Sequence, residues 1–338
     1  MELRTIMALG ESSYAITLPI PWIASNKLKK GDKVSVFTQH DGSLAVIPSV
    51  IEEEVKRITL FVKPEASKES IIRRIIAAYL DGYSLIELKS GSIFTSDQQQ
   101  LIRQTVGNLY MMIIESEANR LVLETLIDES KASVQSTIER MHVITYSMCM
   151  DTIKAFKEWD KRLAESVLTL ENDVDQLLFL ILRLIRSAAM TPSLASQLGI
   201  QTLDCLDHQA LVRSIENIAD LVTEIARSLV CLIENNEKIP DKVRSVLLEA
   251  AEIAFKSFDV AVLSYLSKNI EPTNEIIDDQ TRIEDLYKEI TPLPDLGEPY
   301  VAVVLSNLIN IRENIIKIGD RAADIAELTI DRSYKSVS

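Results

Sequence analysis

Hydrophobic residues recur at helical spacing through residues 210–230, ALVRSIENIADLVTEIARSLV, and acidic residues recur beside them. Glu216, Asp220 and Glu224 follow at intervals of four, so one helix stacks three carboxylates on one face. Like charges at this spacing repel by about 0.2–0.5 kcal/mol per pair. This acidic ladder therefore needs either open solvent or a compensating charge. The apolar positions are spaced as in an amphipathic helix: Leu211, Ile215, Ile218, Val222, Ile225 and Leu229.

The same periodicity continues through the C-terminal part of the chain. Prolines end helices because they lack an N–H, and they interrupt the pattern at four places: Thr191-Pro192, Ile239-Pro240, Pro272 and Thr291-Pro292-Leu293-Pro294. We interpret the result as two three-helix bundles, over residues 128–235 and 236–335. The helices are predicted over roughly these ranges: 130–160, 165–190, 205–235, 239–268, 274–291 and 299–331.

The two bundles form an internal repeat. Shifted by 100 residues, the segment above aligns with IRENIIKIGDRAADIAELTI, and a small residue, Ala219 or Gly319, precedes the shared aspartate. Such a residue lets a neighbouring helix approach closely. With a shift of 109 the middle helices align, so that Asp175, which follows Glu171 by one turn, falls on Glu284. The acidic positions of the third helices pair as follows, first repeat before second: Glu216 and Ile316, Asp220 and Asp320, Glu224 and Asp324.

Residues 1–48 have a different pattern, with β-prone runs at Thr5–Leu9 and Tyr14–Pro19 around a turn at Gly10. We expect one or two helical turns at Trp22–Lys27, and then two strands in GDKVSVFTQHDGSLAVIP that join at Asp41-Gly42. About fifty residues of this kind cannot bury an adequate core alone. Dimerisation is the simplest remedy.

Residues 50–127 predict a small α/β domain. RITLFV and YSLIEL are strands separated by a helix that Ser67 caps and that runs to Leu80. Ser96 and Gln99 form a capping box for a second helix. LYMMIIE and RLVLETLI then supply a last pair of strands. The predicted fold is therefore mainly α, with tandem three-helix bundles preceded by a β-rich domain and a small α/β domain.

Charge is distributed unevenly along the chain. Of the formal net charge of −14, residues 128–338 carry −13, and an acidic surface attracts cations or basic partners and repels nucleic acid. The three cysteines form no CxxC pair, which favours a reducing cytoplasm. No signal pattern or run of apolar residues long enough to cross a membrane is present.

The acidic ladder has two interpretations. In the first, the ladder is only a salt-bridged, solvated face, because Arg213 and Arg227 lie three residues from Glu216 and Glu224. Carboxylates without nearby His or Cys, however, select hard multivalent cations such as Mg²⁺, Mn²⁺, Ca²⁺ or iron. With three histidines in the chain, a His-rich zinc site is nearly excluded, and His208 is expected to be a cap or surface residue.

The helical tandem, with SIENIAD and IIKIGDRAADIAE on the third helices, resembles the PhoU family over about residues 130–332. That family regulates phosphate uptake, has two three-helix bundles, and binds multinuclear metal clusters through a Glu/Asp-xxx-Asp motif in each. The resemblance implies bound metal (iron, manganese, magnesium or zinc) and leaves the second cluster in question, because Ile316 replaces the first acid there. The implied ligands are Glu171, Asp175, Glu216, Asp220, Glu224, Glu284, Asp320 and Asp324.

The N-terminal run SYAITLPIPWIASNKLKKGDKVSVFTQHDGSLAVIP resembles the AbrB/SpoVT swapped-hairpin domain, in which two chains interleave and bind DNA. LKKGDKV is its most specific piece, whereas Ile20 stands where many relatives have lysine. The resemblance implies a homodimer and makes DNA a candidate partner, although four acidic residues nearly cancel the basic ones. The candidate DNA contacts are Arg4, Lys27, Lys29, Lys30 and Lys33. The combination with a PhoU-like bundle resembles archaeal phosphate uptake regulators.

Together these patterns predict a cytoplasmic, non-enzymatic, metal-binding regulator of phosphate uptake that meets a transporter or a signalling protein. One alternative is a carboxylate-bridged di-metal enzyme, but such sites use a Glu-x-x-His motif from each of two helices, and the sequence contains one such motif, at Glu139 and His142. The other alternative is a structural scaffold or transcription regulator whose acidic helices are only solvated surface. Loss of metal on substitution of Glu216 and Asp220 separates the first hypothesis from the last.

Overall fold

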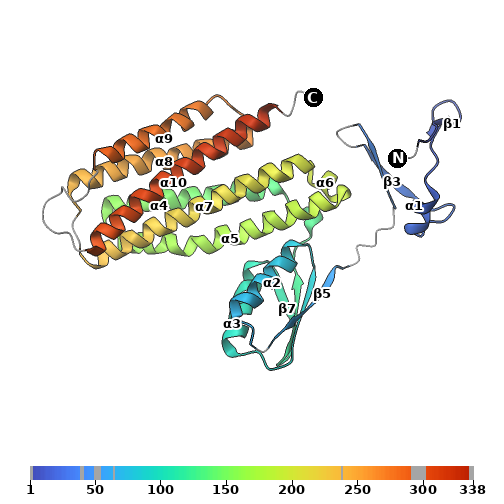
Figure 1. Cartoon of the computed structure of the whole chain (residues 1–338), viewed down its shortest axis with the longest axis horizontal. Helices are drawn as coiled ribbons and strands as arrows, with labels where there is room; N and C mark the ends of the chain where they lie inside the picture. The colour runs from blue at the N-terminus through green and yellow to red at the C-terminus, as the bar shows by residue number, and fades with distance from the viewer. Residues whose placement is uncertain are drawn as a thin grey trace. The chain divides into compact units, whose positions relative to one another are not determined.

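The structure is a computed structural model that describes residues 3–38, 42–48, 55–63, 65–236, 239–290 and 302–334. The chain divides into two compact units, Met1–Val55 and Lys56–Ser338 (Figure 1). The first is β-rich and the second is mainly helical, so the predicted fold class is confirmed. Asp41, Pro292 and Pro294, where a turn and a helix break were predicted, lie outside the described residues.

The first unit contains two antiparallel hairpins and a short helix. The helix begins at Ile20, two residues before the predicted start, because proline fits the first turn of a helix and Pro21 occupies it. Gly10 has φ 77°, which supplies the tight turn of the first hairpin. The elements are β1 (Met7–Ala8), β2 (Tyr14–Ala15), α1 (Ile20–Ser25), β3 (Val34–Thr38) and β4 (Leu44–Pro48).

This unit has no core of its own within the residues whose side chains the structure describes, because none of them is buried. Large apolar side chains are instead exposed along both hairpins and the helix. Leu3 is 88% exposed, Ile20 81% and Tyr14 78%, and six more in this unit are more than half exposed: Ile6, Leu9, Ile16, Val36, Leu44 and Val55. Exposed apolar side chains of this kind are typical of a surface that a partner covers.

The second unit begins with the predicted α/β sandwich, in which two helices cover one face of a four-stranded sheet (Figure 1). The strand order is β5-β6-β8-β7, with β5 and β6 parallel and the other pairs antiparallel. Ser67 caps the first helix as predicted, but the second capping box is Thr95 with Gln98, one residue before the predicted pair. The elements are β5 (Arg57–Val62), α2 (Lys68–Leu80), β6 (Leu85–Ser90), α3 (Ser96–Asn108), β7 (Met111–Ser116) and β8 (Arg120–Thr125).

The six predicted long helices follow, after the single-turn η1 (Glu129–Lys131). An additional short helix, α6 (Pro192–Leu198), follows α5 where the sequence predicts only a break at Thr191-Pro192. Pro192 instead occupies the first turn, where its missing N–H costs nothing, and Gly199 ends the helix with φ 66°. The long helices are α4 (Val134–Glu158), α5 (Lys161–Met190), α7 (Thr202–Glu234), α8 (Asp241–Ser267), α9 (Thr273–Lys288) and α10 (Ala302–Ser333). No helix in the described part is long and apolar enough to cross a membrane.

The internal repeat is visible in the packing of α7 and α10. Residues 215–220 and 315–320 have the same succession of buried, half-buried and exposed positions. The predicted close approach at the small residue is confirmed in the second copy, where a Cβ added to Gly319 would lie 2.9 Å from Ile283 Cδ1. The two halves therefore share one packing plan in which the motif residues keep the same helical phase.

Arg183 on α5 joins the α/β sandwich to the helical bundle. Its side chain is only 1% exposed. Its Nε donates to Glu129 Oε1 at 2.6 Å, and its Nη1 donates to the carbonyls of Tyr79 and Tyr83 at 2.5 and 3.0 Å. The guanidinium also lies 4.7 Å from the centre of the Tyr79 ring. Removing this side chain would leave the half-buried Glu129 carboxylate without its cation and take a donor from each of the two carbonyls.

We predict that Arg183→Ala lowers the free energy of unfolding by about 3–5 kcal/mol, because breaking a buried ion pair leaves its partner uncompensated. Urea denaturation of the full chain measures the change. Arg186→Ala is the control, since Arg186 lies one turn further along α5 but is 50% exposed in its pair with Asp81, and it should cost no more than about 1 kcal/mol. Equal losses for the two variants would contradict the anchoring role of Arg183.

Candidate metal centre

Two antiparallel neighbours, α5 and α7, position the candidate site. Asp175 on α5 faces Glu216 and Asp220 on α7, and one carboxylate oxygen from each lies within 4.8 Å of the other two. The residues beside them in sequence, Val174 and Ile215, are buried in the bundle core. Packing of the apolar stripes therefore sets the helical phase that directs the carboxylates toward one another.

These three carboxylates lack protein partners. Within the described residues, none of them accepts a hydrogen bond or forms an ion pair. Asp175 and Glu216 are nevertheless half-buried, so water solvates them incompletely. Half-buried carboxylates usually have hydrogen-bond donors or cations around them. This grouping therefore differs from an ordinary solvated face.

Burial and mutual repulsion raise the pKa of each member of the group. The pKa of Glu216 rises to about 7, chiefly through burial and then through the charge of Asp220, with Arg213 opposing the shift. The pKa of Asp175 rises to about 6 through burial and the charges of Asp220 and Glu171. The pKa of Asp220 is also raised. A multivalent cation bound among the three would reverse these shifts, because it favours the ionised forms.

Two further predicted ligands, Glu171 and Glu224, continue the group along the same helices. The pKa of Glu171 is raised by burial and by Asp220, which places its carboxyl near the group. Glu224 instead forms an ion pair with Arg227. The salt-bridged surface that the sequence left open is thus present at Glu224 but not at the three gathered carboxylates.

The second repeat arranges its predicted ligands differently. Asp320 accepts a hydrogen bond from Gln280 Nε2 at 2.6 Å, and Asp324 pairs with Arg321 at 2.7 Å. Glu284 is exposed on α9. In the described part of the chain, these acids are not gathered into a group that could hold a metal ion.

The candidate DNA contacts lie in the first unit and are all exposed: Arg4, Lys27, Lys29, Lys30 and Lys33. The LKKGDKV segment forms a defined turn, in which the Lys29 backbone N–H donates to Asp32 Oδ2 at 2.7 Å and Gly31 has φ 100°. The turn presents neighbouring lysine side chains to the outside of the unit.

His208 was expected to be a cap or surface residue, and this expectation is wrong, since it lies inside α7 and is buried. The side chain is 7% exposed, and its Nδ1 lies 2.9 Å from the Tyr265 hydroxyl in a hydrogen bond between α7 and α8. Arg332 from α10 stacks on the same tyrosine ring, 4.5 Å from its centre. The error arose because a helix-start position can turn inward when other helices cover it, which sequence position alone does not show.

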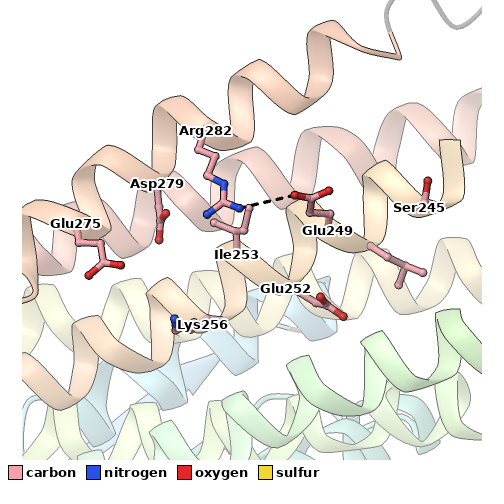
Figure 2. A pocket seen from close by; sticks show the side chains of 9 residues that line it. Ser245, Glu249, Glu252, Ile253, Lys256, Glu275, Asp279 and Arg282 are labelled. Carbon is pink, nitrogen blue, oxygen red and sulfur yellow. Dashed lines mark ion pairs between the residues drawn. The ribbon is translucent and has the colours of Figure 1, made fainter. Parts of the chain in front are cut away.

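A groove of about 640 Å³ between α8 and α9 was not predicted (Figure 2). Its walls mix both signs of charge, and Arg282 reaches across from α9 to Glu249 on α8 at 3.7 Å. Asp279 accepts a hydrogen bond from Ser257 at 2.8 Å. These pairings leave the groove largely self-compensated, unlike the carboxylates between α5 and α7.

Comparison with known proteins supports the two resemblances. Residues 138–229 match the model of the PhoU domain, a span that includes the gathered carboxylates. The helical bundle is PhoU-like. Residues 8–54 match the model described as antidote-toxin recognition MazE, bacterial antitoxin, which is of the AbrB type. No curated protein matches the chain.

A solved structure, the crystal structure of PhoU from Pseudomonas aeruginosa, is also similar to the chain. The two share 19% sequence identity, with a TM-score of 0.48. The match covers 58% of this chain and 93% of the PhoU chain.

The raised pKa of Glu216 predicts a pH-dependent stability of the metal-free protein. Between its ordinary value of 4.5 and the folded value of about 7, the folded chain holds a proton that the unfolded chain has released. The free energy of unfolding therefore falls as the pH rises through this window. The free energy of unfolding of Glu216→Gln should fall less over this pH range. In the presence of a chelator at pH 8, the Tm of this variant should exceed that of the wild type by about 2–4 °C.

Thermal scans between pH 5 and pH 8 test this prediction. Glu139→Gln is the control, because Glu139 is an exposed acid on α4 and its replacement should leave the pH profile unchanged. If the Tm of the wild type and that of Glu216→Gln changed in parallel with pH, the pKa of Glu216 would not be raised in the folded protein.

Proposed function

We propose that the protein is a cytoplasmic, metal-binding, non-enzymatic regulator of phosphate uptake, which dimerises through its N-terminal unit and binds DNA with it. The observation that carries the proposal is the group of Asp175, Glu216 and Asp220, three unpartnered carboxylates within 4.8 Å of one another. The PhoU-domain match over the same residues supports the biological context. The three cysteines are all unpaired, in keeping with a reducing compartment.

The donor set fits a hard cation. All candidate ligands are carboxylate oxygens, which suit Mg²⁺, Mn²⁺ and iron, whereas zinc in proteins usually takes nitrogen or sulfur ligands. Asp175, Glu216 and Asp220 would hold the ion, and Glu171 lies next to them. The ion would supply the positive charge that stabilises the packed α5–α7 pair, and an outward-facing part of that charge would remain available to an anion such as phosphate.

Binding of metal at this site is tested with Glu216→Gln combined with Asp220→Asn. We expect the wild-type protein to retain metal after gentle purification, and the double variant to lose at least about nine tenths of it, because two of the three gathered ligands become neutral. Elemental analysis measures the content, and Glu139→Gln serves as the control. Wild-type protein without metal, or a double variant that keeps it while folded, would favour the scaffold alternative.

The regulatory role has a separate test in the cell. Deletion of the gene should change the expression of phosphate-uptake genes when phosphate is varied, and the double variant should fail to restore the response. A deletion with no phosphate-dependent effect would contradict the proposed role even if metal binds.

The N-terminal unit supports dimerisation and DNA binding by two different features. Its exposed apolar side chains need a second copy to cover them, and the MazE-type match covers this region. Two copies would bring ten basic groups together, which would contact DNA phosphates. We expect the intact chain to sediment as a dimer at micromolar concentration.

Substitution of Lys29 and Lys30 tests the DNA contact. We predict that Lys29→Gln combined with Lys30→Gln weakens DNA binding for all sequences by a similar factor and lowers the salt dependence of log K by about 3–4 in a dimer, since each lost phosphate contact removes about 0.9. Fluorescence anisotropy over a salt series measures both quantities. Lys242→Gln, on α8 in the second unit, is the control. An unchanged salt slope would show that these lysines do not contact DNA.

A further inference from the structure

The two halves of the bundle differ at the positions that would hold metal. The first repeat has acids at five aligned positions: Glu171, Asp175, Glu216, Asp220 and Glu224. The second repeat keeps three acids and has an amide and an apolar residue at the other two: Gln280, Glu284, Ile316, Asp320 and Asp324. The two acids without an acidic counterpart in the second repeat are Glu171, which aligns with Gln280, and Glu216, which aligns with Ile316. One comes from each helix.

Burial at the two replaced positions is the same in both repeats. Glu216 and Ile316 occupy the same half-buried step in identical successions of buried and half-buried residues. Glu171 and Gln280 are half-buried as well. At these two positions the halves therefore differ in side-chain chemistry and not in burial, and they differ in burial at the third position of the middle helices, where Asp175 is half-buried and Glu284 is exposed.

In the second repeat, protein groups supply the compensation that metal would supply in the first. Gln280 Nε2 donates to Asp320 Oδ1 at 2.6 Å, and Arg321 Nη1 lies 2.7 Å from Asp324 Oδ2. The amide directs its donor hydrogens at the carboxylate, so a cation placed there would meet them as well. Ile316 offers no oxygen ligand where Glu216 has two.

We infer that the chain holds metal in its first bundle alone, and that the second bundle is a metal-independent copy whose site is closed by Gln280, Ile316 and Arg321. This inference rests on the proposed function, because it assigns metal to the first repeat. It departs from the two-cluster arrangement that the family resemblance implies. Metal-dependent changes are then confined to the α5–α7 pair.

Elemental analysis and metal-dependent melting of four full-length proteins test the inference, with iron, manganese, magnesium and zinc all supplied during expression. The proteins are the wild type, the first-repeat variant Glu216→Gln with Asp220→Asn, the second-repeat variant Asp320→Asn with Asp324→Asn, and the restored variant Gln280→Glu with Ile316→Glu. We expect the first-repeat variant to lose all specifically bound metal and the second-repeat variant to lose none. The restored variant should hold about twice the wild-type content and gain a larger rise in Tm on metal addition.

The outcomes separate this inference from the proposed function. Wild-type protein without metal overturns both. Metal retained by the first-repeat variant but removed by further substitution of Asp320 and Asp324 leaves metal binding intact and overturns only the single-bundle inference. A folded restored variant that gains no metal overturns the assignment of the closure to Gln280 and Ile316. Should the restored variant not fold, the second-repeat variant still decides the question, since any loss of metal there contradicts the inference.

Discussion

The packing of α5 against α7 holds three carboxylates closer together than their charges favour. The apolar stripes of the two helices are fully buried, and the burial of even two or three aliphatic side chains outweighs repulsion of a fraction of a kcal/mol per exposed pair. The raised pKa values of Glu216 and Asp175 record the strain that remains. A bound cation would remove this strain, so metal occupancy and the stability of the first bundle are linked in the same residues.

Helix α5, which carries Asp175, also connects the bundle to the α/β sandwich. Gln176, the residue after Asp175, donates from Nε2 to the carbonyl of Gly107 at 3.0 Å, and Arg183 lies two turns further along α5. A displacement of α5 that adjusts the carboxylates to a cation would therefore act directly on contacts with the sandwich. The ion pairs of the groove between α8 and α9 instead join α8 to α9, through Glu249 and Arg282, and α8 to α4, through Glu252 and Lys157 (Figure 2).

Features that depend on local periodicity could be predicted from the sequence. The long helices, the Ser67 cap and the placing of Glu216 and Asp220 on one helix face follow from spacing along the chain, whereas Asp175 was named as their neighbour through the family resemblance. Other features depend on tertiary contacts that the sequence does not show. The burial of His208 depends on Tyr265 and Arg332 from two other helices. The short helix α6 could not be predicted from Pro192, because a proline fits the first turn of a helix as well as a break between helices. The pairing of Gln280 with Asp320 needed the distance between α9 and α10.

Divergence between the two halves follows from the cost of an unoccupied acidic site. A bundle that must stay folded without metal gains stability when an acid of the group becomes an amide or an aliphatic residue, since repulsion is replaced by a hydrogen bond or an apolar contact. A bundle that responds to metal must keep the repulsion, because that is what binding relieves. The second repeat has replaced acids in this way, at Gln280 and Ile316. The first repeat keeps its acids and therefore keeps the repulsion that a bound cation would relieve. If metal binds as proposed, a metal-independent half beside a metal-dependent half would give the α5–α7 pair a fixed surface to move against, which two equivalent halves would not provide.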